Sequence, residues 1–281
     1  MAGRPYGTTL PALAGWPRDS IPDPRPATLP CVAATPRQRG RGWFITIEGP
    51  EGAGKTSQAD RLVRVANSAG LRPVLVREPG GTPVGERLRR VLLDSDPADT
   101  PIGPRTDALL FNAARAQLVT DLIEPALAAG DLVISTRFAD STIAYQGYGA
   151  GLSLEELRAL ERFATGGLRP DLTILLDLPV EVGLARKRDT EVTRFEAAFD
   201  LTFHRRVRRG FLELAADEPE RFVVIDGGST PEVVEAAILA AVLRLTGPWP
   251  LAVTGAGSTD VSAGPAGGAG EPVGPLERIP Q

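Results

Sequence analysis

The sequence is poor in the residues that build disulfides and protein-bound metal sites. Its 281 residues contain one cysteine, Cys31, and one histidine, His204. A single cysteine excludes a disulfide within the chain, and one thiol with one imidazole is too small a set for a structural zinc site. We therefore expect a protein of a reducing compartment, located in the cytoplasm, in which Cys31 is chemically inert.

Long apolar runs and a strong excess of one charge are also missing. No stretch approaches the roughly 20 apolar residues needed to cross a bilayer, and the N-terminal arginines are not followed by the apolar core of a secretion signal. The chain has 31 basic and 35 acidic residues, for a net charge of −4. This balance gives no general reason to expect nucleic acid or a membrane surface as a partner.

The two ends of the chain lack the apolar periodicity of folded segments. Residues 1–41 are rich in Pro, Ala, Arg and Thr, and residues 248–281 are dominated by Gly, Ala, Pro and Ser. Such segments bury too little apolar surface to offset the entropy lost on ordering. We expect a disordered N-terminal extension (1–41), one folded domain (42–247) and a disordered C-terminal tail (248–281).

Within residues 42–247, short β-rich runs alternate with helical patterns. The expected strands are Trp43–Glu48, Arg72–Arg77, Leu132–Ser135, Asp171–Asp177 and Arg221–Asp226. The expected helices lie near Thr56–Ala69, Arg105–Ala129, Val180–Arg188 and Phe195–Ala216, with a last helix from Thr230. This alternation predicts an α/β fold with a parallel five-stranded sheet flanked by helices on both faces. Ligands of such sheets bind at the carboxyl ends of the strands.

The segment GPEGAGKT, from Gly49 to Thr56, lies between the first strand and the first helix. It fits G-x-x-x-x-G-K-[ST], which indicates a P-loop NTPase fold. Backbone N–H groups of such a loop surround the β-phosphate of ATP, the lysine reaches the β- and γ-phosphates, and the Thr56 hydroxyl is a candidate ligand of Mg²⁺. The expected ATP-binding residues here are Gly49, Pro50, Glu51, Gly52, Ala53, Gly54, Lys55, Thr56 and Ser57. The other reading is a chance glycine-rich turn, although Lys55 is one of only two lysines in the chain.

The phosphate loop alone does not identify the group that accepts the phosphate. GTPases, motor ATPases and small-molecule kinases all carry this loop, but the N-K-x-D sequence typical of GTPases is absent. Further segments, listed here, make the chain resemble the thymidylate kinase family over about Trp43 to Thr246: REPGGT at 77–82, FNAARAQ at 111–117, RFADSTIAYQGYGAGL at 137–152 and RKRDTEVTRFE at 186–196.

The resemblance implies transfer of the ATP γ-phosphoryl group to dTMP, giving dTDP, by a homodimer with ATP and dTMP as partners. The segment at 186–196 resembles the lid of that family. A neutral phosphate loop, with Gly52 and Ala53, beside a basic lid is similar to the bacterial type. Two alternatives stay open: a kinase of another nucleoside monophosphate or of a deoxynucleoside, and a nucleotide-binding protein that has lost catalysis.

Three side chains are the first candidates for holding dTMP. Arg77 follows the second strand, where a guanidinium can grip a phosphate in two places. Phe111 and Arg115 lie four residues apart on one helix face. The resemblance implies that Phe111 stacks on the thymine base and that Arg115 hydrogen-bonds its edge. The competing readings are an ion pair between Arg77 and Glu78, and a plain core role for Phe111.

Further acceptor residues come from the resemblance. It implies that Tyr145 packs against the sugar where a 2′-hydroxyl would sit, that Gln146 lies near the base, and that Glu51 holds the 3′-hydroxyl. Ser141 and Thr142 are plausible base contacts, with helix capping as the competing interpretation. For Glu51, the competing interpretation is a solvated loop carboxylate.

Phosphoryl transfer needs positive charge around the migrating group. The expected catalytic residues are Lys55, Arg137, Arg188 and Arg194, and Arg137 is also expected to contact dTMP. Arg186 is expected to bind ATP. Arginines on a solvated helix are the alternative, and this is the reading we adopt for Lys187.

One position departs from the family pattern. The third strand ends in Thr136-Arg137, where the family usually has Asp-Arg, and the lid has Thr193-Arg194 where Asp-Arg is common. A carboxylate attracts Mg²⁺ and its waters more strongly than a hydroxyl. Thr136 can still hydrogen-bond a metal-bound water, and Glu48 is a possible nearby source of charge. We expect an active enzyme with altered metal dependence.

Overall fold

The computed structural model describes residues 40–93, 102–187 and 200–249. Five strands form one sheet: β1 (Trp43–Glu48), β2 (Pro73–Arg77), β3 (Leu132–Thr136), β4 (Leu172–Asp177) and β5 (Phe222–Asp226). Their order is β2-β3-β1-β4-β5 and every neighbouring pair is parallel. The predicted five-stranded parallel sheet is therefore confirmed, with strand ends within one residue of the expected ones.

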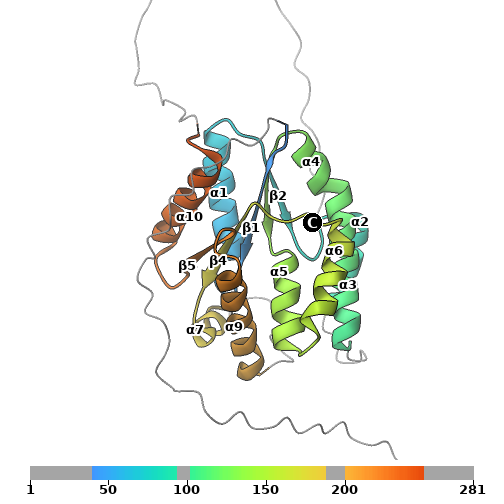
Figure 1. Cartoon of the computed structure of the whole chain (residues 1–281). Coiled ribbons are helices and arrows are strands. Elements are labelled where there is room, and N and C mark those ends of the chain that lie inside the picture. Colours follow the sequence, from blue (N-terminus) through green and yellow to red (C-terminus); the bar gives the residue numbers. More distant parts are fainter. Residues whose placement is uncertain (1–39, 94–101, 188–199, 250–281) are drawn as a thin grey trace, which may run out of the picture. The chain divides into compact units, whose positions relative to one another are not determined.

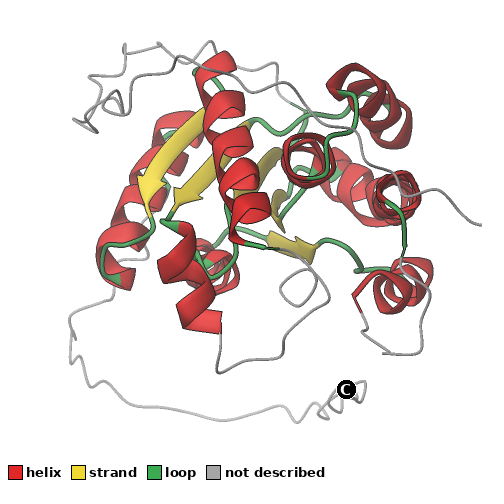
Figure 2. Ribbon diagram, turned by 90° about the horizontal axis from the view of Figure 1, so that it is seen from below, coloured by secondary structure: helices red, strands yellow, loops and turns green. Residues whose placement is uncertain are grey.

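Helices cover both faces of the sheet (Figures 1 and 2). On one face lie α1 (Lys55–Ser68) and α10 (Pro231–Thr246), which contact each other. The other elements are α2 (Pro83–Leu93), α3 (Pro104–Leu118), η1 (Val119–Ile123), α4 (Glu124–Ala128), α5 (Ala139–Thr142), η2 (Ile143–Gly149), α6 (Leu154–Thr165), α7 (Val180–Lys187) and α9 (Leu201–Asp217). Of these, η1 and η2 are π-helical segments.

The central strand β1 shows why both faces are covered. Successive side chains of a strand point to opposite faces, and β1 is apolar at nearly every position. Ile45 and Ile47 enter the core formed with α1 and α10, whereas Phe44 enters the core on the opposite face. All three side chains are fully buried. A strand buried on both sides requires helices on both sides.

Several helices were not predicted. The sequence reading assigned no element to α2, α5, η2 or α6, and it treated residues 105–129 as one regular helix. The structure has α3, η1 and α4 over that range, so the helix is continuous but contains a π-helical turn. Residues 188–199 lie outside the described residues, so the expected start of a helix at Phe195 is not covered. None of the helices in the described part of the chain has the length and apolar character of a membrane-spanning segment.

The parallel arrangement brings the chemically interesting segments to one edge. The phosphate loop follows β1, Arg77 ends β2, and Thr136 ends β3. In the strand register, Thr136 is level with both Ile47 of β1 and Arg77 of β2. The carboxyl edge of the sheet therefore unites residues that lie far apart in the sequence.

Candidate functional site

The phosphate loop passes so close to its neighbours that two of its glycines have no room for a side chain. A Cβ at Gly49 would lie 2.4 Å from the carbonyl oxygen of Leu176, and one at Gly52 would lie 2.1 Å from that of Gly183. Gly52 also has a φ of 71°, which favours glycine. The loop is thus held against β4 and α7, and α1 begins at Lys55 directly after it.

The lysine of the loop is folded onto the loop itself. Its Nζ donates to the carbonyl oxygens of Gly49 at 3.0 Å and Pro50 at 2.7 Å. Burial lowers the pKa of Lys55 to about 7, and the nearby charge of Arg137 contributes in the same direction. A bound anion would raise that pKa again, because opposite charge stabilises the ammonium form. Thr56 and Ser57, the next two residues, are exposed.

A pocket of about 780 Å³ opens beside the loop. The expected site residues that line it are Glu51, Gly52, Gly54, Lys55, Thr56, Ser57, Arg77, Phe111, Arg115, Arg137, Ser141, Tyr145, Gln146 and Arg186. Gly49, Pro50 and Ala53 belong to the loop but do not line the pocket. Arg188 and Arg194 lie outside the described residues.

The pocket is strongly basic. Five arginines and two lysines line it, against only two glutamates. Arg186 on α7 donates from Nη1 to the carbonyl oxygen of Gly227 at 3.0 Å and lies 3.5 Å from that of Gly52. An excess of cations around a concave site predicts an anionic ligand.

Glu51, Arg137 and Tyr145 form one cluster inside the pocket. The Nη2 of Arg137 donates to Glu51 Oε1 at 2.7 Å and to the Tyr145 hydroxyl at 3.1 Å, and that hydroxyl donates to the same carboxylate oxygen at 2.7 Å. Burial alone would raise the pKa of Glu51, but Arg137, Lys55 and Lys187 together hold it well below its ordinary value. Glu51 is therefore a charged, bonded carboxylate, and the reading of it as a solvated loop residue is wrong.

The backbone of Arg137 is strained. Its φ of 72° is the only positive φ of a non-glycine residue in the described part of the chain. The N–H of Arg137 donates to Ile47 O at 3.1 Å, and its carbonyl accepts from Ser135 Oγ at 2.7 Å. Its guanidinium carbon lies 4.9 Å from the centre of the Tyr145 ring. Backbone strain of this kind costs about 1–3 kcal/mol and is concentrated at functional sites.

Glu48, which we considered as a source of charge near Thr136, does not line the pocket. It is fully buried at the end of β1, where its oxygens accept from Phe138 N–H and from the Ser141 hydroxyl, both at 2.7 Å. Burial, together with the charge of Asp140, raises its pKa to about 7. Thr136 itself lines the pocket and is buried.

The remaining candidates for acceptor binding also line the pocket. Arg77 is largely exposed and lies 3.6 Å from Glu86, so it does not pair with Glu78 as the competing reading required. Phe111 lines the pocket and also packs against the core of α6, η2 and α9, so it has the predicted core contacts, while its stacking on a base stays a prediction. Gln146 is buried in η2 and lines the pocket.

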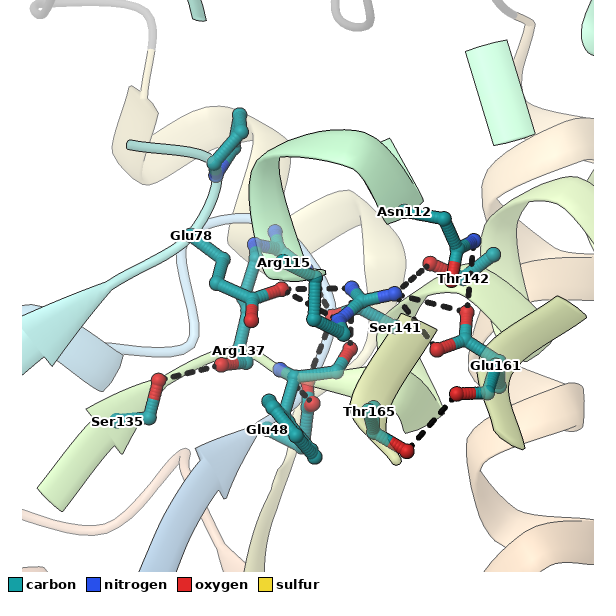
Figure 3. A network of polar contacts seen from close by, with 12 residues as sticks. Glu48, Glu78, Asn112, Arg115, Ser135, Arg137, Ser141, Thr142, Glu161 and Thr165 are labelled. Atoms are coloured by element: carbon teal, nitrogen blue, oxygen red, sulfur yellow. Dashed lines mark hydrogen bonds and ion pairs between the residues drawn. The ribbon is translucent and has the colours of Figure 1, made fainter. Parts of the chain in front are cut away.

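Arg115 is only 1% exposed, and Figure 3 shows it between two glutamates. Its Nε donates to Glu78 Oε2 at 2.8 Å, and its Nη1 lies 2.8 Å from both oxygens of Glu161. Nη1 also donates to Thr142 Oγ1 at 3.0 Å. Thr142 is thus a partner of Arg115, and helix α5 has no side-chain cap, so the capping alternative is wrong.

Three residues of this region were not predicted from the sequence to belong to the site. Glu78 and Glu161 become visible only through their shared partner Arg115, from which they are 37 and 46 residues distant. Lys187 was interpreted as a solvated lysine. That interpretation is wrong, because Lys187 lines the pocket and its Nζ lies 3.5 Å from Glu51 Oε2. Its place in the middle of the basic run Arg186-Lys187-Arg188 carried no signal that separated it from its neighbours.

A phosphate loop at the carboxyl edge of a parallel sheet, opening onto a basic pocket with aromatic and amide side chains, defines a P-loop phosphotransferase. The family model described as "Thymidylate kinase" matches residues 47–238. The chain belongs to the thymidylate kinase family.

Individual relatives agree with this assignment. The chain is 52% identical over 203 residues to the thymidylate kinase of Deinococcus radiodurans, covering 72% of this chain and 97% of that protein. It is 49% identical over 209 residues to the enzyme of Geotalea uraniireducens, with the same coverage. The crystal structure of thymidylate kinase from Ehrlichia chaffeensis is similar with a TM-score of 0.58 and 31% identity, covering 72% of this chain and 98% of that one.

Proposed function

We propose that this chain transfers the γ-phosphoryl group of ATP to dTMP, giving dTDP and ADP. A phosphate oxygen of dTMP attacks the γ-phosphorus, and the bond from that phosphorus to the β,γ-bridging oxygen breaks, leaving the electron pair on ADP. One observation carries the proposal. A single pocket joins the phosphate loop to Phe111, Gln146 and a cluster of arginines, so donor and acceptor nucleotides can meet in it.

The donor half is the loop from Gly49 to Ser57 with Arg186. The loop N–H groups and the start of α1 bind the phosphates, and Lys55 exchanges the loop carbonyls for the β- and γ-oxygens. Arg186 reaches the phosphate loop and the turn after β5, which supports a role at the ATP molecule. We propose that Arg188 and Arg194 complete the positive charge around the migrating group.

The acceptor half lies between α3, η2 and the end of β2. Arg77 is proposed to hold the phosphate of dTMP, with Phe111 stacked on the base and Arg115 and Gln146 at its edge. Ser141 contributes to the base wall. Glu51 and Tyr145 are proposed to face the sugar, with Arg137 between the sugar and the migrating phosphate. Their mutual hydrogen bonds preorganise this cluster before either nucleotide binds.

We propose Mg²⁺ as the cofactor, and the residues present fit it. In the described part of the chain no group of three or more His, Cys, Asp and Glu side chains is arranged to hold a metal. Mg²⁺ keeps several waters and is commonly bound through one or two protein oxygens plus substrate phosphates, so it needs no such group. The exposed Thr56 hydroxyl would be its protein ligand, and the Thr136 hydroxyl can hold one of its waters. When bound, the ion supplies positive charge at the β- and γ-oxygens.

The activity is tested by coupling ADP formation to a spectroscopic assay with dTMP, dUMP, dCMP and UMP as acceptors. We expect turnover to be fastest with dTMP and slowest with UMP, because Tyr145 occupies the space that a 2′-hydroxyl needs. The same assay on Thr136→Asp should show a lower Mg²⁺ concentration at half-maximal rate, by about tenfold. No dTDP at any Mg²⁺ or Mn²⁺ concentration would rule out the proposed function, and equal rates on UMP would rule out the role of Tyr145.

We further propose that residues 42–247 are the catalytic domain and that the protein is a homodimer. The family model lies within these bounds, and relatives are covered almost completely by 72% of this chain. Large apolar side chains are exposed on α2, α3 and α6, namely Val84, Val91, Leu109 and Phe163. Phe163 is 88% exposed. Because α3 contacts both α2 and α6, we propose that these exposed apolar side chains contribute to the interface between two copies of the chain.

A further inference from the structure

Arg115 has no spare hydrogen-bonding capacity in the folded chain. Its Nη2 donates to the carbonyl oxygen of Phe138 at 3.1 Å and lies 2.6 Å from Glu78 Oε2, in addition to the bonds of Nε and Nη1. A guanidinium has five N–H donors, and Glu78, Glu161, Thr142 and Phe138 engage all of them. An arginine in this state can bond the base of a nucleotide only if one of these partners gives way.

The two carboxylates lie on different sides of the guanidinium. Glu78 lines the pocket, whereas Glu161 lies behind Arg115, on α6, and does not line the pocket (Figure 3). Glu161 is also tied to the surrounding helices, since Oε1 accepts from Asn112 Nδ2 at 3.2 Å and its own carbonyl accepts from Thr165 Oγ1 at 2.8 Å. Glu78 keeps one buried carboxylate oxygen, Oε1, without a hydrogen-bond partner.

The charge balance also distinguishes the two partners. Two carboxylates share one arginine, so one of them is in excess when both are ionised. Burial raises the pKa of Glu78 to about 7 in spite of Arg115. Burial raises the pKa of Glu161 as well, but hydrogen bonds from Asn112, Thr142 and Arg115 oppose the shift. Glu78 is the carboxylate that is held less completely.

We propose that Glu161 is a positioning residue for acceptor specificity: it anchors Arg115 from behind while Glu78 occupies, in the free protein, the place of the base. The proposal rests on the proposed function. On binding, a carbonyl oxygen of the base takes the pocket-facing N–H of Arg115 from Glu78, and the pair of Arg115 with Glu161 stays intact.

This arrangement distinguishes bases by the hydrogen-bonding groups on their edges. A guanidinium donates hydrogen bonds and accepts none, so it pairs with a thymine carbonyl and is left unpaired against the amino group of cytosine. The selection works only if the guanidinium keeps its direction. Glu161, which grips Nη1 with both oxygens, supplies that restraint from outside the pocket.

The test compares Glu161→Gln with Glu155→Gln, which removes an exposed carboxylate from the same helix. Steady-state assays of the full chain give KM for dTMP and ATP, kcat, and the inhibition constant of dCMP as a competitor of dTMP. For Glu161→Gln we expect KM for dTMP to rise by about tenfold and the preference for dTMP over dCMP to fall by a similar factor. The values of kcat and of KM for ATP should stay within about twofold of wild type. Glu155→Gln should match the wild type in every value.

A double-mutant cycle decides whether Glu161 acts through Arg115. In an Arg115→Ala background, Glu161→Gln should cause no further loss of preference; a further loss of equal size would overturn the proposal. An unchanged preference in folded Glu161→Gln would also overturn it. If Glu161→Gln does not fold, Glu161→Asp replaces it, because the shorter side chain keeps the charge but moves the carboxylate oxygens away from Arg115. A severalfold loss of the preference for dTMP over dCMP would then support the proposal, and no loss would overturn it. Wild-type turnover of dTMP in the same assay tests the proposed function separately.

Discussion

The side chain of Glu48 is a buried acid that holds two elements of the site together. It joins the end of β1 to Phe138 and Ser141, directly after the strained Arg137. Both donors contribute neutral hydrogen bonds, which a protonated or an ionised carboxyl can accept. The fully buried position makes ionisation costly, so the pKa rises from 4.5 to about 7. Glu48 thus links protonation to folding at a position next to the phosphate loop.

This link predicts how stability changes with pH. A raised pKa means that the folded chain keeps a proton that the unfolded chain has already released between pH 4.5 and 7. The contribution of Glu48 to stability is therefore fully present below pH 4.5 and is lost as pH rises through 7. Glu48→Gln abolishes this dependence, so its stability relative to wild type should improve by on the order of 2 kcal/mol between pH 5 and pH 8.

Urea denaturation at both pH values measures this difference. Glu155→Gln, at an exposed position, is the matched control and should follow the wild-type pH dependence. A constant difference between wild type and Glu48→Gln from pH 5 to pH 8 would show that Glu48 titrates normally in the folded chain.

At the level of elements, the strands could be predicted from the sequence because each apolar run has glycine or proline close to at least one of its ends. The phosphate loop and the helix face with Phe111 and Arg115 could be predicted for the same reason, because each depends on a short sequence pattern. Segment 137–152 could not be assigned, since its mixture of Ala, Gly, Tyr and Ser has no clear period. The structure shows a short α-helix followed by a π-helix there, stabilised by packing against α9. Tertiary contacts decide its conformation, and no local pattern predicts them.

The packing of η2 against α9 depends on two reciprocal notches. Gly149 of η2 faces Phe203, and a Cβ there would lie 2.7 Å from the ring. Gly210 of α9 faces Tyr148, and a Cβ there would lie 2.6 Å from that ring. Each helix therefore receives an aromatic ring of the other helix at its own glycine. This close approach places Tyr145 and Gln146, which also belong to η2, at the wall of the pocket.

Filling one notch should loosen this packing. Gly210→Ala gains helix propensity but forces its methyl group against Tyr148, and we expect a net loss of about 1–3 kcal/mol in the free energy of unfolding. Displacement of Tyr148 moves η2, which also carries Tyr145 and Gln146 of the proposed dTMP site. KM for dTMP should therefore rise more than KM for ATP. Gly103→Ala is the control, since no heavy atom lies within 4 Å of the added Cβ. Urea denaturation and the coupled assay give both quantities; an equal or greater stability of Gly210→Ala would contradict the notch.

On the scale of the whole molecule, the charge is unevenly distributed. The chain as a whole is acidic, with a net charge of −4, whereas the pocket is lined by seven cations and two carboxylates. The overall composition therefore did not indicate a basic site. The sequence motifs predicted several of its cations, but the pairing of Glu78 and Glu161 with Arg115 depends on contacts between helices that no single segment encodes. Long-range contacts of this kind set the limit of prediction from one sequence.

The domain and the assembly can be tested together. We expect a fragment of residues 40–249 to be active and to have the same oligomeric state as the full chain, because it contains all the described residues and the entire match to the family. By light scattering after size-exclusion chromatography, both should have the mass of a dimer. Phe163→Glu should shift the equilibrium to the monomer, since a charge within the proposed apolar interface would be buried without a partner.

The control for this shift is Arg158→Glu, which reverses a charge at an exposed position of the same helix and leaves the exposed apolar side chains unchanged. A dimeric Phe163→Glu with unchanged dissociation on dilution would exclude α6 from the interface, and a monomeric wild type would exclude the dimer itself. An inactive fragment 40–249 would instead show that residues beyond the proposed domain contribute to the site. The domain proposal can therefore fail separately from the dimer, and the interface proposal can fail while the dimer stands.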